Sequence, residues 1–159
     1  IRTMENPIHM GFYNELGATA VTLASSEAFT ALQQGTIDGM DNVLDAMCNL
    51  GGWDSAKHVT LSEHFIGLLI GSMSAKLWDG LSAEDQALVS AAMQAASERG
   101  RELAADAKDT YVAKGKEMGV TFTEVDFSEW IPYAKKVWDD NRSSIPAEWF
   151  DPIYAELFG

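Results

Sequence analysis

The sequence feature that most restricts the fold is a helical pattern that runs from Ser82 to Met118. Ser82 and Asp85 resemble a capping box with a shortened acid, and the next helix-breaking residue is Gly119. At roughly 1.5 Å per residue this helix would be about 55 Å long, whereas a globule of this chain length is only about 40 Å across. We therefore expect the helix to bend or to span more than one lobe.

One stripe of this helix is formed by small and apolar residues that recur every three or four positions, and it includes two glycines, Gly100 and Gly115. Glycine inside a helix costs about 1 kcal/mol relative to alanine, so each glycine calls for a structural reason. A kink in the helix and the close approach of another segment both satisfy that requirement, and the sequence leaves the two open.

The rest of the chain alternates short strand patterns with helical patterns, which predicts an α/β fold. Helices are expected after caps at Asn6, at Ser25 or Ser26, at Asn42 and at Ser128, and from Pro146 onward. Strands are expected at Ile1 to Met4, Ala20 to Leu23, Thr36 and Ile37, His58 to Leu61, Phe65 to Met73, and Val120 to Val125. The run from Phe65 to Met73 is almost wholly apolar, which is typical of a strand buried on both faces.

Charge and composition narrow the function classes. The chain has 24 Asp and Glu against 11 Lys and Arg, a formal charge of −13, which repels nucleic acid and anionic lipid surfaces. No apolar run approaches the length of about 20 residues that a membrane-spanning helix needs. We therefore expect a soluble protein with neither nucleic acid nor a membrane as its direct partner. The single cysteine, Cys48, offers no internal disulfide and no structural zinc site.

Enzyme signatures are scarce in this sequence. No nucleotide-binding, nucleophile-elbow or zinc-protease motif is present. The histidines lie apart in sequence, so we expect each to be a surface or packing residue: His9, His58 and His64. Asp38, Asp41 and Asp45 form the local acidic cluster, which leaves open a small acidic α/β enzyme that uses a divalent metal ion. The ordinary preference of aspartate for turns explains the same cluster, and an acidic interaction domain is a third class of function.

Arg2 differs from the other cations because it follows an apolar strand residue and precedes the helix start at Asn6 and Pro7. Ligands of open α/β sheets bind beyond the carboxyl ends of strands, so an arginine here is placed to meet an anion. A salt bridge to one of the 24 acidic residues is the alternative interpretation.

One segment carries a resemblance to a known family. The stretch SEAFTALQQGTIDGMDN, Ser26 to Asn42, closely resembles the signature of the DctP-type solute-binding proteins of TRAP (tripartite ATP-independent periplasmic) transporters. Arg2 matches the arginine of the family's KIRxxxNP segment, Gly17 and Ala18 match its LGA, and LWDGLSAEDQ from Leu77 to Gln86 also follows the pattern.

The resemblance implies roles for individual residues. It assigns to Arg2 a bidentate salt bridge with a substrate carboxylate, and to Asn42 a hydrogen bond with the ligand. Glu5 occupies a position that lines the site in relatives, and Ser25 replaces an aromatic residue that walls the pocket. A small hydroxyl leaves more room and one more hydrogen-bonding group, which favours a polyhydroxylated acid such as a sugar acid.

The resemblance also implies an architecture and a setting. The chain corresponds to the C-terminal half of a periplasmic solute-binding protein, whose two lobes are joined by hinge strands and one long bracing helix. Residues 1–66 and 108–159 are then most of the second lobe, and residues 67–107 hold the hinge strand and long helix that contribute to the other lobe. The implied function is to clamp an organic acid for membrane subunits of a TRAP transporter, without cofactor, metal or catalysis. The resemblance further implies export to the periplasm by a signal peptide outside residues 1–159.

Overall fold

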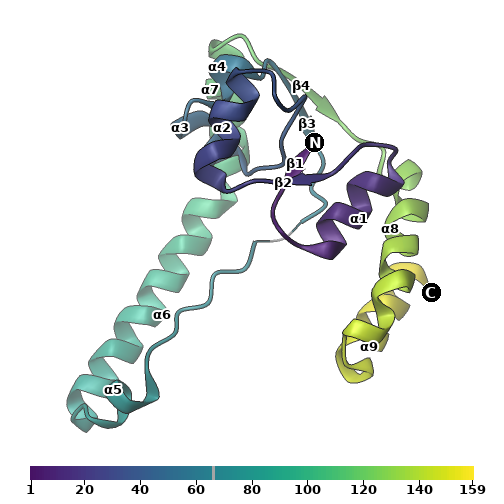
Figure 1. The fold of residues 1–159 in the computed structure, drawn as a ribbon. Helices are drawn as coiled ribbons and strands as arrows, with labels where there is room; N and C mark the ends of the chain where they lie inside the picture. The colour runs from purple at the N-terminus through teal and green to yellow at the C-terminus, as the bar shows by residue number, and fades with distance from the viewer. Residues whose placement is uncertain (66) are drawn as a thin grey trace.

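The computed structural model of the protein describes residues 1–65 and 67–159. The first part of the chain runs through β1 (Arg2–Thr3), α1 (Pro7–Glu15), β2 (Val21–Thr22), α2 (Ser25–Gln33), α3 (Leu44–Asn49), α4 (Gly52–Ser55) and β3 (His58–Leu61). The second part runs through α5 (Ala75–Asp79), α6 (Ala83–Ala105), α7 (Ala107–Glu117), β4 (Thr121–Glu124), α8 (Phe127–Asn141), the short 3-10 helix η1 (Arg142–Ser144) and α9 (Ala147–Phe158). Figure 1 shows a body made by the two ends of the chain and an arm, formed by α5 and α6, that projects from it.

The strands form two small parallel pairs. β1 pairs with β2, with Arg2 opposite Val21, and β3 pairs with β4, with His58 opposite Thr121. The parallel arrangement agrees with the strand and helix alternation of the sequence, because parallel strands need a crossover between them. The strand expected at Thr36 and Ile37 is not formed. Instead, Met40, three residues further along the chain, forms an isolated parallel β-bridge with Arg2 of β1.

The best-buried core lies between α4, α7 and β4. Trp53 is fully buried there and packs with Met47 and Val120. The ring of Trp53 meets the ring of Phe122 edge to face, with centroids 5.9 Å apart. This core holds the β3–β4 pair against α7, so the segment that follows β3 leaves the body from a fixed position.

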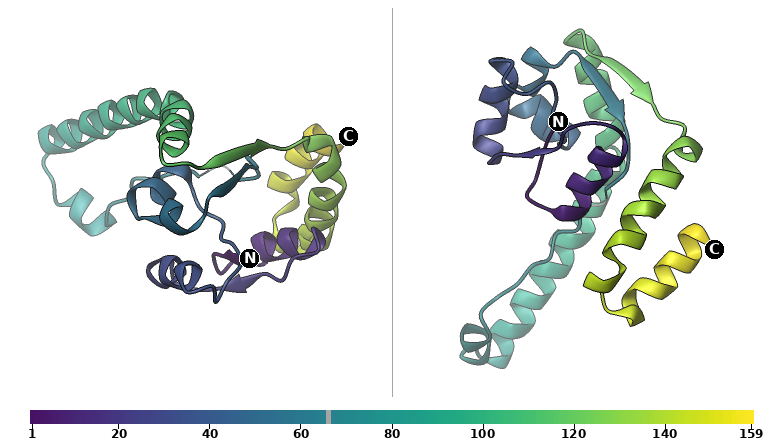
Figure 2. Two further views of the ribbon diagram at one scale, coloured as in Figure 1. Left: turned by 90° about the horizontal axis from the view of Figure 1, so that it is seen from above. Right: turned by 45° about the vertical axis from the view of Figure 1, so that its right-hand side comes forward.

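The long helix expected from Ser82 to Met118 is two helices. Ser82 caps α6 as predicted, because its hydroxyl accepts a hydrogen bond from the Asp85 N–H at 3.1 Å. The first helix, α6, ends at Ala105. Asp106 is both the C-cap of α6 and the N-cap of α7. Figure 2 shows that the two helices meet at an angle, so the prediction that the helix bends is confirmed.

The two stripe glycines turn out to have different surroundings. A Cβ atom on Gly115 would lie 2.5 Å from Cζ of Phe122 and 3.3 Å from Cη2 of Trp53, so this glycine permits close packing of α7 on β4. A Cβ atom on Gly100 would meet no heavy atom of the described residues within 4 Å. The helix breaks at Asp106, and neither glycine lies at the break.

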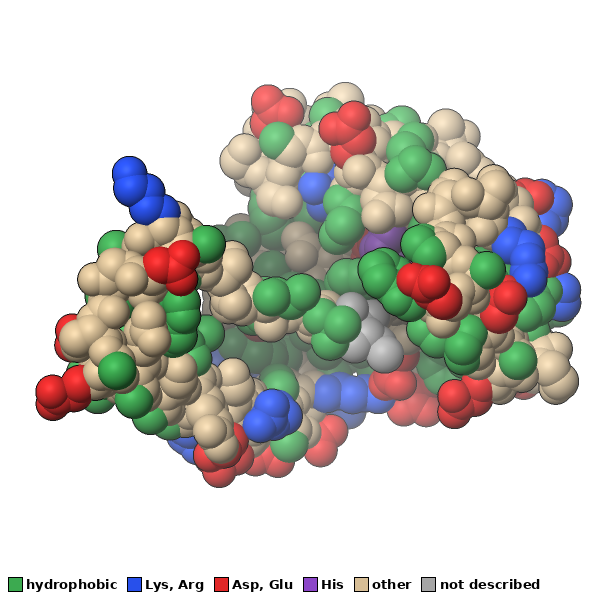
Figure 3. Space-filling view, turned by 90° about the horizontal axis from the view of Figure 1, so that it is seen from below, with side chains coloured by type: hydrophobic (Ala, Val, Ile, Leu, Met, Phe, Trp, Pro, Cys, Tyr) green, Lys and Arg blue, Asp and Glu red, His purple; other side chains and the backbone are tan. Residues whose placement is uncertain are grey.

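The strand expected at Phe65 to Met73 is not formed. Phe65 and residues 67–74 have no regular secondary structure, and Ile66 lies outside the described residues. A strand requires a hydrogen-bonded neighbour, and β3, which precedes this segment, and β4, which follows it, pair with each other. The side chains of Leu68, Leu69 and Ile70 are largely exposed, at 80%, 102% and 85%. Figure 3 shows the molecule from below, with hydrophobic side chains exposed across the middle of that face.

Three helix starts differ from the expected ones. Ala24, not a serine side chain, occupies the cap of α2, and Val43 rather than Asn42 caps α3. Asn42 instead accepts a hydrogen bond from the neighbouring Val43 N–H at 2.9 Å. Asp126 replaces Ser128 as the cap of α8, with its carboxylate accepting from the Ser128 N–H at 2.9 Å. Each shift moves the start by one or two residues, and Ala24 and Val43 occupy their cap positions without a side-chain hydrogen bond.

In the parts of the chain that the structure describes, no helix combines the length and the apolar character required to cross a bilayer.

Candidate functional site

The guanidinium of Arg2 is the centre of the candidate site. Its residue is only 5% exposed, because β1 lies between β2 and the Gly39–Asp41 segment. Its Nε and Nη2 atoms donate to the carbonyl oxygen of Leu23 at 3.0 and 2.8 Å. Nη1 makes only a long contact of 3.5 Å to the carbonyl of Asp41. The Leu23 carbonyl thus fixes the Nε and Nη2 side of the guanidinium, whereas Nη1 has no short hydrogen bond in the described chain.

No salt bridge joins Arg2 to an acidic side chain among residues 1–65 and 67–159, although the ion pairs of other basic residues are present there. The salt-bridge interpretation of Arg2 therefore finds no partner in the described chain. A buried cation is costly without a counter-charge, and backbone carbonyls offset only part of that cost. An anion bound at Nη1 would supply the missing charge.

Two other predicted residues lie beside this arginine. Nη2 of Arg2 donates to Oγ of Ser25 at 3.3 Å, at the first turn of α2. The Arg2 N–H donates to the carbonyl of Gly39 at 2.8 Å, and the Asp41 N–H donates to the carbonyl of Arg2 at 2.8 Å. Because Asp41 pairs with Arg2, the next residue, Asn42, also lies near Arg2. Arg2, Ser25 and Asn42 all border one open hollow.

The hollow has a volume of about 1320 Å³ and lies between the body and the helices that leave it. Its lining joins the β1 and Ser25 region, the loop that leads into α3, the end of β3, and the junction of α6 and α7. Lys108 and Glu63 form an ion pair across its far side. A space of this size, with converging polar groups and an unbalanced cation, suits a small polar ligand.

Other predicted residues are not brought to Arg2. Glu5 is exposed and does not border the hollow, whereas its neighbour Met4 does. Asp38 is exposed in a turn, while Asp45 lines the hollow at the start of α3. In the described chain the carboxylates of Asp38, Asp41 and Asp45 form no common metal-binding group. The geometry therefore does not assemble the acidic cluster on which the metal-dependent enzyme interpretation rested.

The structure assembles a cluster that the sequence did not indicate. Oδ2 of Asp41 lies 3.5 Å from Nδ1 of His9 and 3.6 Å from Nε2 of His64. The hydroxyl of Tyr13 lies 3.4 Å from the same His64 nitrogen. His9 and Tyr13 come from α1, Asp41 follows the Met40 bridge, and His64 follows β3, so only the fold joins them. His9 and His64 do pack against aromatic rings, as expected of packing residues, but the sequence did not indicate that they share Asp41 as a neighbour.

The two titratable oxygens of this cluster respond to their surroundings in opposite ways. Burial acts to raise the pKa of Asp41, but the nearby imidazole rings of His64 and His9 outweigh it and hold that pKa below its ordinary value. Burial, together with the charge and hydrogen bond of Asp41, raises the pKa of Tyr13 well above its ordinary value. Asp41 is therefore the anion of the cluster, and Tyr13 is a neutral donor.

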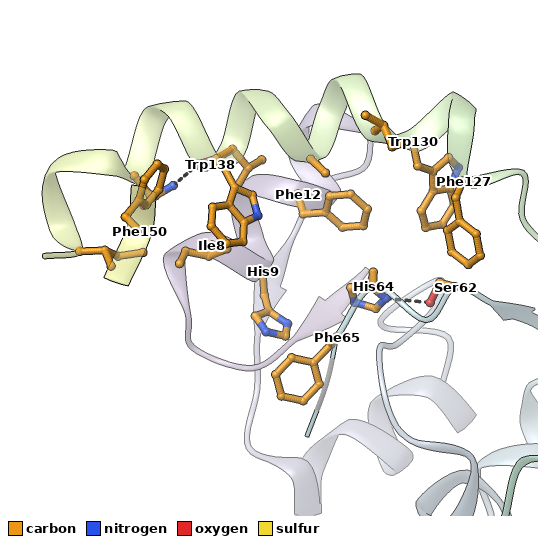
Figure 4. Close-up of a pocket in the computed structure, with 15 residues that line it drawn as sticks. Ile8, His9, Phe12, Ser62, His64, Phe65, Phe127, Trp130, Trp138 and Phe150 are labelled. Atoms are coloured by element: carbon orange, nitrogen blue, oxygen red, sulfur yellow. Dashed lines mark hydrogen bonds between the residues drawn. The ribbon is translucent and has the colours of Figure 1, made fainter. Parts of the chain in front are cut away.

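A second, smaller hollow of about 310 Å³ lies on the other side of His64, between α1, α8 and α9. Figure 4 shows Phe12, Trp130, Trp138 and Phe150 around it, with His9 and His64 at one edge. Its lining is almost wholly aromatic and aliphatic, so it lacks the polar groups that a charged solute needs. The Arg2 side therefore remains the better candidate for a solute site.

Comparison with known proteins identifies the family. Residues 1–144 match the model of the DctP family, described as bacterial extracellular solute-binding protein, family 7. The chain belongs to this family. The family is one of extracellular solute-binding proteins, and the solved relatives include TRAP periplasmic solute binding proteins.

Individual relatives agree with the family match. A solute-binding protein of Verminephrobacter eiseniae is 40% identical over 122 residues, which cover 76% of this chain and 36% of that protein. The 2,3-diketo-L-gulonate-binding periplasmic protein of Escherichia coli is 29% identical over 128 residues, 79% of this chain and 39% of that protein. These alignments leave more than half of each relative unmatched.

A solved structure shows the fold relation directly. The crystal structure of a TRAP periplasmic solute binding protein from Roseobacter denitrificans, with bound 3-deoxy-D-manno-oct-2-ulosonic acid, superposes with a TM-score of 0.87. It is 28% identical in sequence, and the match covers 97% of this chain and 51% of that one. The chain thus has the fold of about half of a TRAP solute-binding protein, which confirms the predicted fold class.

Proposed function

We propose that this DctP-family chain forms most of one lobe and the brace of a periplasmic clamp. The clamp closes on an organic acid and presents it to the membrane subunits of a TRAP transporter. It acts by binding, without catalysis and without a cofactor in the solute site. Residues 1–66 and 108–159 belong to the lobe, and residues 67–107 carry the hinge segment and the brace toward a second lobe.

The observation that carries this proposal is the buried guanidinium of Arg2 with Nη1 weakly occupied and no acidic partner in the described chain. A carboxylate with two oxygens matches the planar fork of an arginine, whereas a lysine offers only a point charge. The net charge of −13 repels anions at long range, so a bound acid depends on local groups such as this one. Asn42 adds a side-chain amide on the same wall.

The ligand class proposed is a polyhydroxylated acid such as a sugar acid. Ser25 places a small hydroxyl 3.3 Å from Arg2, where it leaves room and adds one hydrogen-bonding group. The relative from Escherichia coli is named as a 2,3-diketo-L-gulonate-binding protein, and the solved structure from Roseobacter denitrificans has bound 3-deoxy-D-manno-oct-2-ulosonic acid. Glu5 is proposed to reach a ligand hydroxyl in the closed clamp.

The test is Arg2→Lys in the full-length protein, with calorimetric titration of a panel of sugar acids and simple carboxylates. Loss of a paired, charged hydrogen bond costs about 1.5–3 kcal/mol, so we expect affinity to fall by roughly 10- to 150-fold. Arg142→Lys is the matched control, because Arg142 is exposed and paired with Asp151 away from the hollow. Unchanged affinity in Arg2→Lys would remove the anchoring role, and absence of any acid ligand for the parent protein would remove the proposed function.

A further inference from the structure

We propose that His9, Asp41 and His64 form a binding site for a divalent transition-metal ion of the zinc class. The site is separate from the carboxylate anchor at Arg2 and does not depend on the proposed transport function. Each residue offers one ligand atom, and the three atoms all lie within 4.8 Å of one another.

The spacing of these atoms fits a metal ion better than direct hydrogen bonds. A hydrogen bond between a ring nitrogen and a carboxylate oxygen is about 2.7–3.0 Å long. The distances here, 3.5 Å from His9 and 3.6 Å from His64, are both longer. Ligands bound to one tetrahedral zinc at about 2.0–2.1 Å lie about 3.4 Å apart, close to both distances to Asp41, and the ligand atoms of His9 and His64 lie within 4.8 Å of each other.

His9 provides an independent indication. Its side chain is only 10% exposed, and its Nδ1 atom has no hydrogen-bond partner among the described residues. A buried nitrogen that remains unsatisfied costs about 1–3 kcal/mol. That nitrogen faces the Asp41 carboxylate, and a metal ion between them would satisfy it.

His64 is oriented as metal-binding histidines usually are. Its Nδ1 atom is hydrogen-bonded to Oγ of Ser62 at 2.7 Å, which leaves Nε2 for the cluster (Figure 4). A hydrogen bond on the second ring nitrogen fixes the orientation of a histidine ligand. The ring also stacks on Phe12, with centroids 5.3 Å apart and planes inclined by 12°.

The donor set selects the kind of ion. Two imidazoles and one carboxylate suit Zn²⁺, Co²⁺ or Ni²⁺, whereas Mg²⁺ and Ca²⁺ prefer oxygen ligands only. Three protein ligands leave a tetrahedral ion one position for water. Asp41 and His64 border the larger hollow, so an ion has a route to the site from solvent.

The experiment is titration of the full-length protein, stripped with a chelator and dialysed, with Zn²⁺ and with Co²⁺. We expect one ion per chain, and a visible Co²⁺ spectrum of the intensity typical of four-coordinate sites. His9→Gln, His64→Gln and Asp41→Asn should each weaken Zn²⁺ binding by more than about 10-fold. His58→Gln is the matched control, since His58 is exposed on β3 and outside the cluster.

Ser62→Ala keeps all three ligands and removes only the hydrogen bond that orients His64, so it should weaken binding by about 10-fold. It also keeps the test decisive if a ligand variant does not fold, as judged by circular dichroism. The proposal is overturned if the parent protein binds no Zn²⁺ or Co²⁺, or if folded ligand variants and Ser62→Ala bind as well as the parent. Equal loss in His58→Gln would also overturn it.

Discussion

At the scale of single residues, the buried Arg2 controls what the larger hollow can bind. Leu23 and Asp41 offer it backbone carbonyls rather than carboxylates. A full salt bridge inside the protein would have neutralised the charge and closed the site to anions. Carbonyl partners hold the guanidinium in place while its charge remains available.

Substitutions of Ser25 test the proposal that the ligand is a sugar acid. Ser25→Ala removes a single hydroxyl, and we expect sugar acids to bind about 2- to 10-fold more weakly, the range for one neutral hydrogen bond. Ser25→Phe fills the space with a ring, and we expect it to reduce sugar-acid affinity further while flat aromatic acids gain affinity. Calorimetry on the full-length protein measures both, with the exposed neighbour in Ser26→Ala as control. Preference of the parent protein for aromatic acids would contradict this prediction.

The sequence predicted the residues around Arg2 but not the histidine cluster, for a physical reason. Ser25 and Asn42 lie in one contiguous signature, so a family resemblance carries them together. His9, Asp41 and His64 come from α1, the Met40 bridge region and the segment after β3, and only tertiary packing brings them within reach. Residues with no regular spacing give no pattern that a sequence can show.

At the scale of elements, the break between α6 and α7 reconciles the helical pattern with the size of the molecule. The apolar stripe continues across Asp106, so periodicity alone predicts one helix. Because one straight helix would be longer than the diameter of a globule of this size, the sequence predicted that the helix bends. The structure places the bend at the polar residue Asp106, not at Gly100 or Gly115. The site of the bend depends on what packs on each side, which local sequence does not encode.

The two glycines provide a matched pair of substitutions. Gly115→Ala places a Cβ against Phe122 and Trp53, and we expect the free energy of unfolding to fall by about 1–3 kcal/mol through overpacking. Gly100→Ala meets open space in the described chain, so we expect a gain of about 0.5–1 kcal/mol from helix propensity. Chemical denaturation compares the two variants. Equal effects of the same sign would contradict the packing role of Gly115.

The start of α8 predicts a pH dependence. The side chain and then the backbone N–H of Ser128 donate to Asp126 and lower the pKa of its carboxyl below the ordinary value of 3.8. Ionised Asp126 therefore stabilises the folded state above pH 3.8, and this contribution disappears as the pH falls through the lower folded pKa. Asp126→Asn keeps an acceptor oxygen but does not titrate. We expect the stability gap between parent and variant to shrink as the pH falls below 3.8, and a constant gap would contradict the assignment.

At the scale of the whole molecule, the described chain exposes more apolar surface than a self-contained domain would. Leu68, Leu69 and Ile70 stand in solvent beside the arm of α5 and α6. Monomeric proteins rarely leave a contiguous apolar segment uncovered. The solved relatives are about twice as long as this chain, so the proposed second lobe has the length to cover it.

This arrangement also accounts for the missing strand. The apolar run from Phe65 to Met73 has the composition of a doubly buried strand, yet residues 67–74 have no regular structure here. A strand forms only where a neighbour supplies its hydrogen bonds. We predict that in the full-length protein this segment pairs with strands of the second lobe and serves as the hinge.

Hydrogen–deuterium exchange tests that prediction on the whole protein. In the full-length protein we expect the amides of residues 67–74 to exchange slowly, because strand pairing would protect them. In the isolated chain of 159 residues the same amides should exchange as fast as an unstructured peptide, while those of β3 and β4 remain protected by their mutual pairing. The β3–β4 pair is thus the internal control for folding of the shorter chain. Fast exchange of residues 67–74 in both proteins would rule out a paired hinge strand and leave the exposed leucines to a different partner.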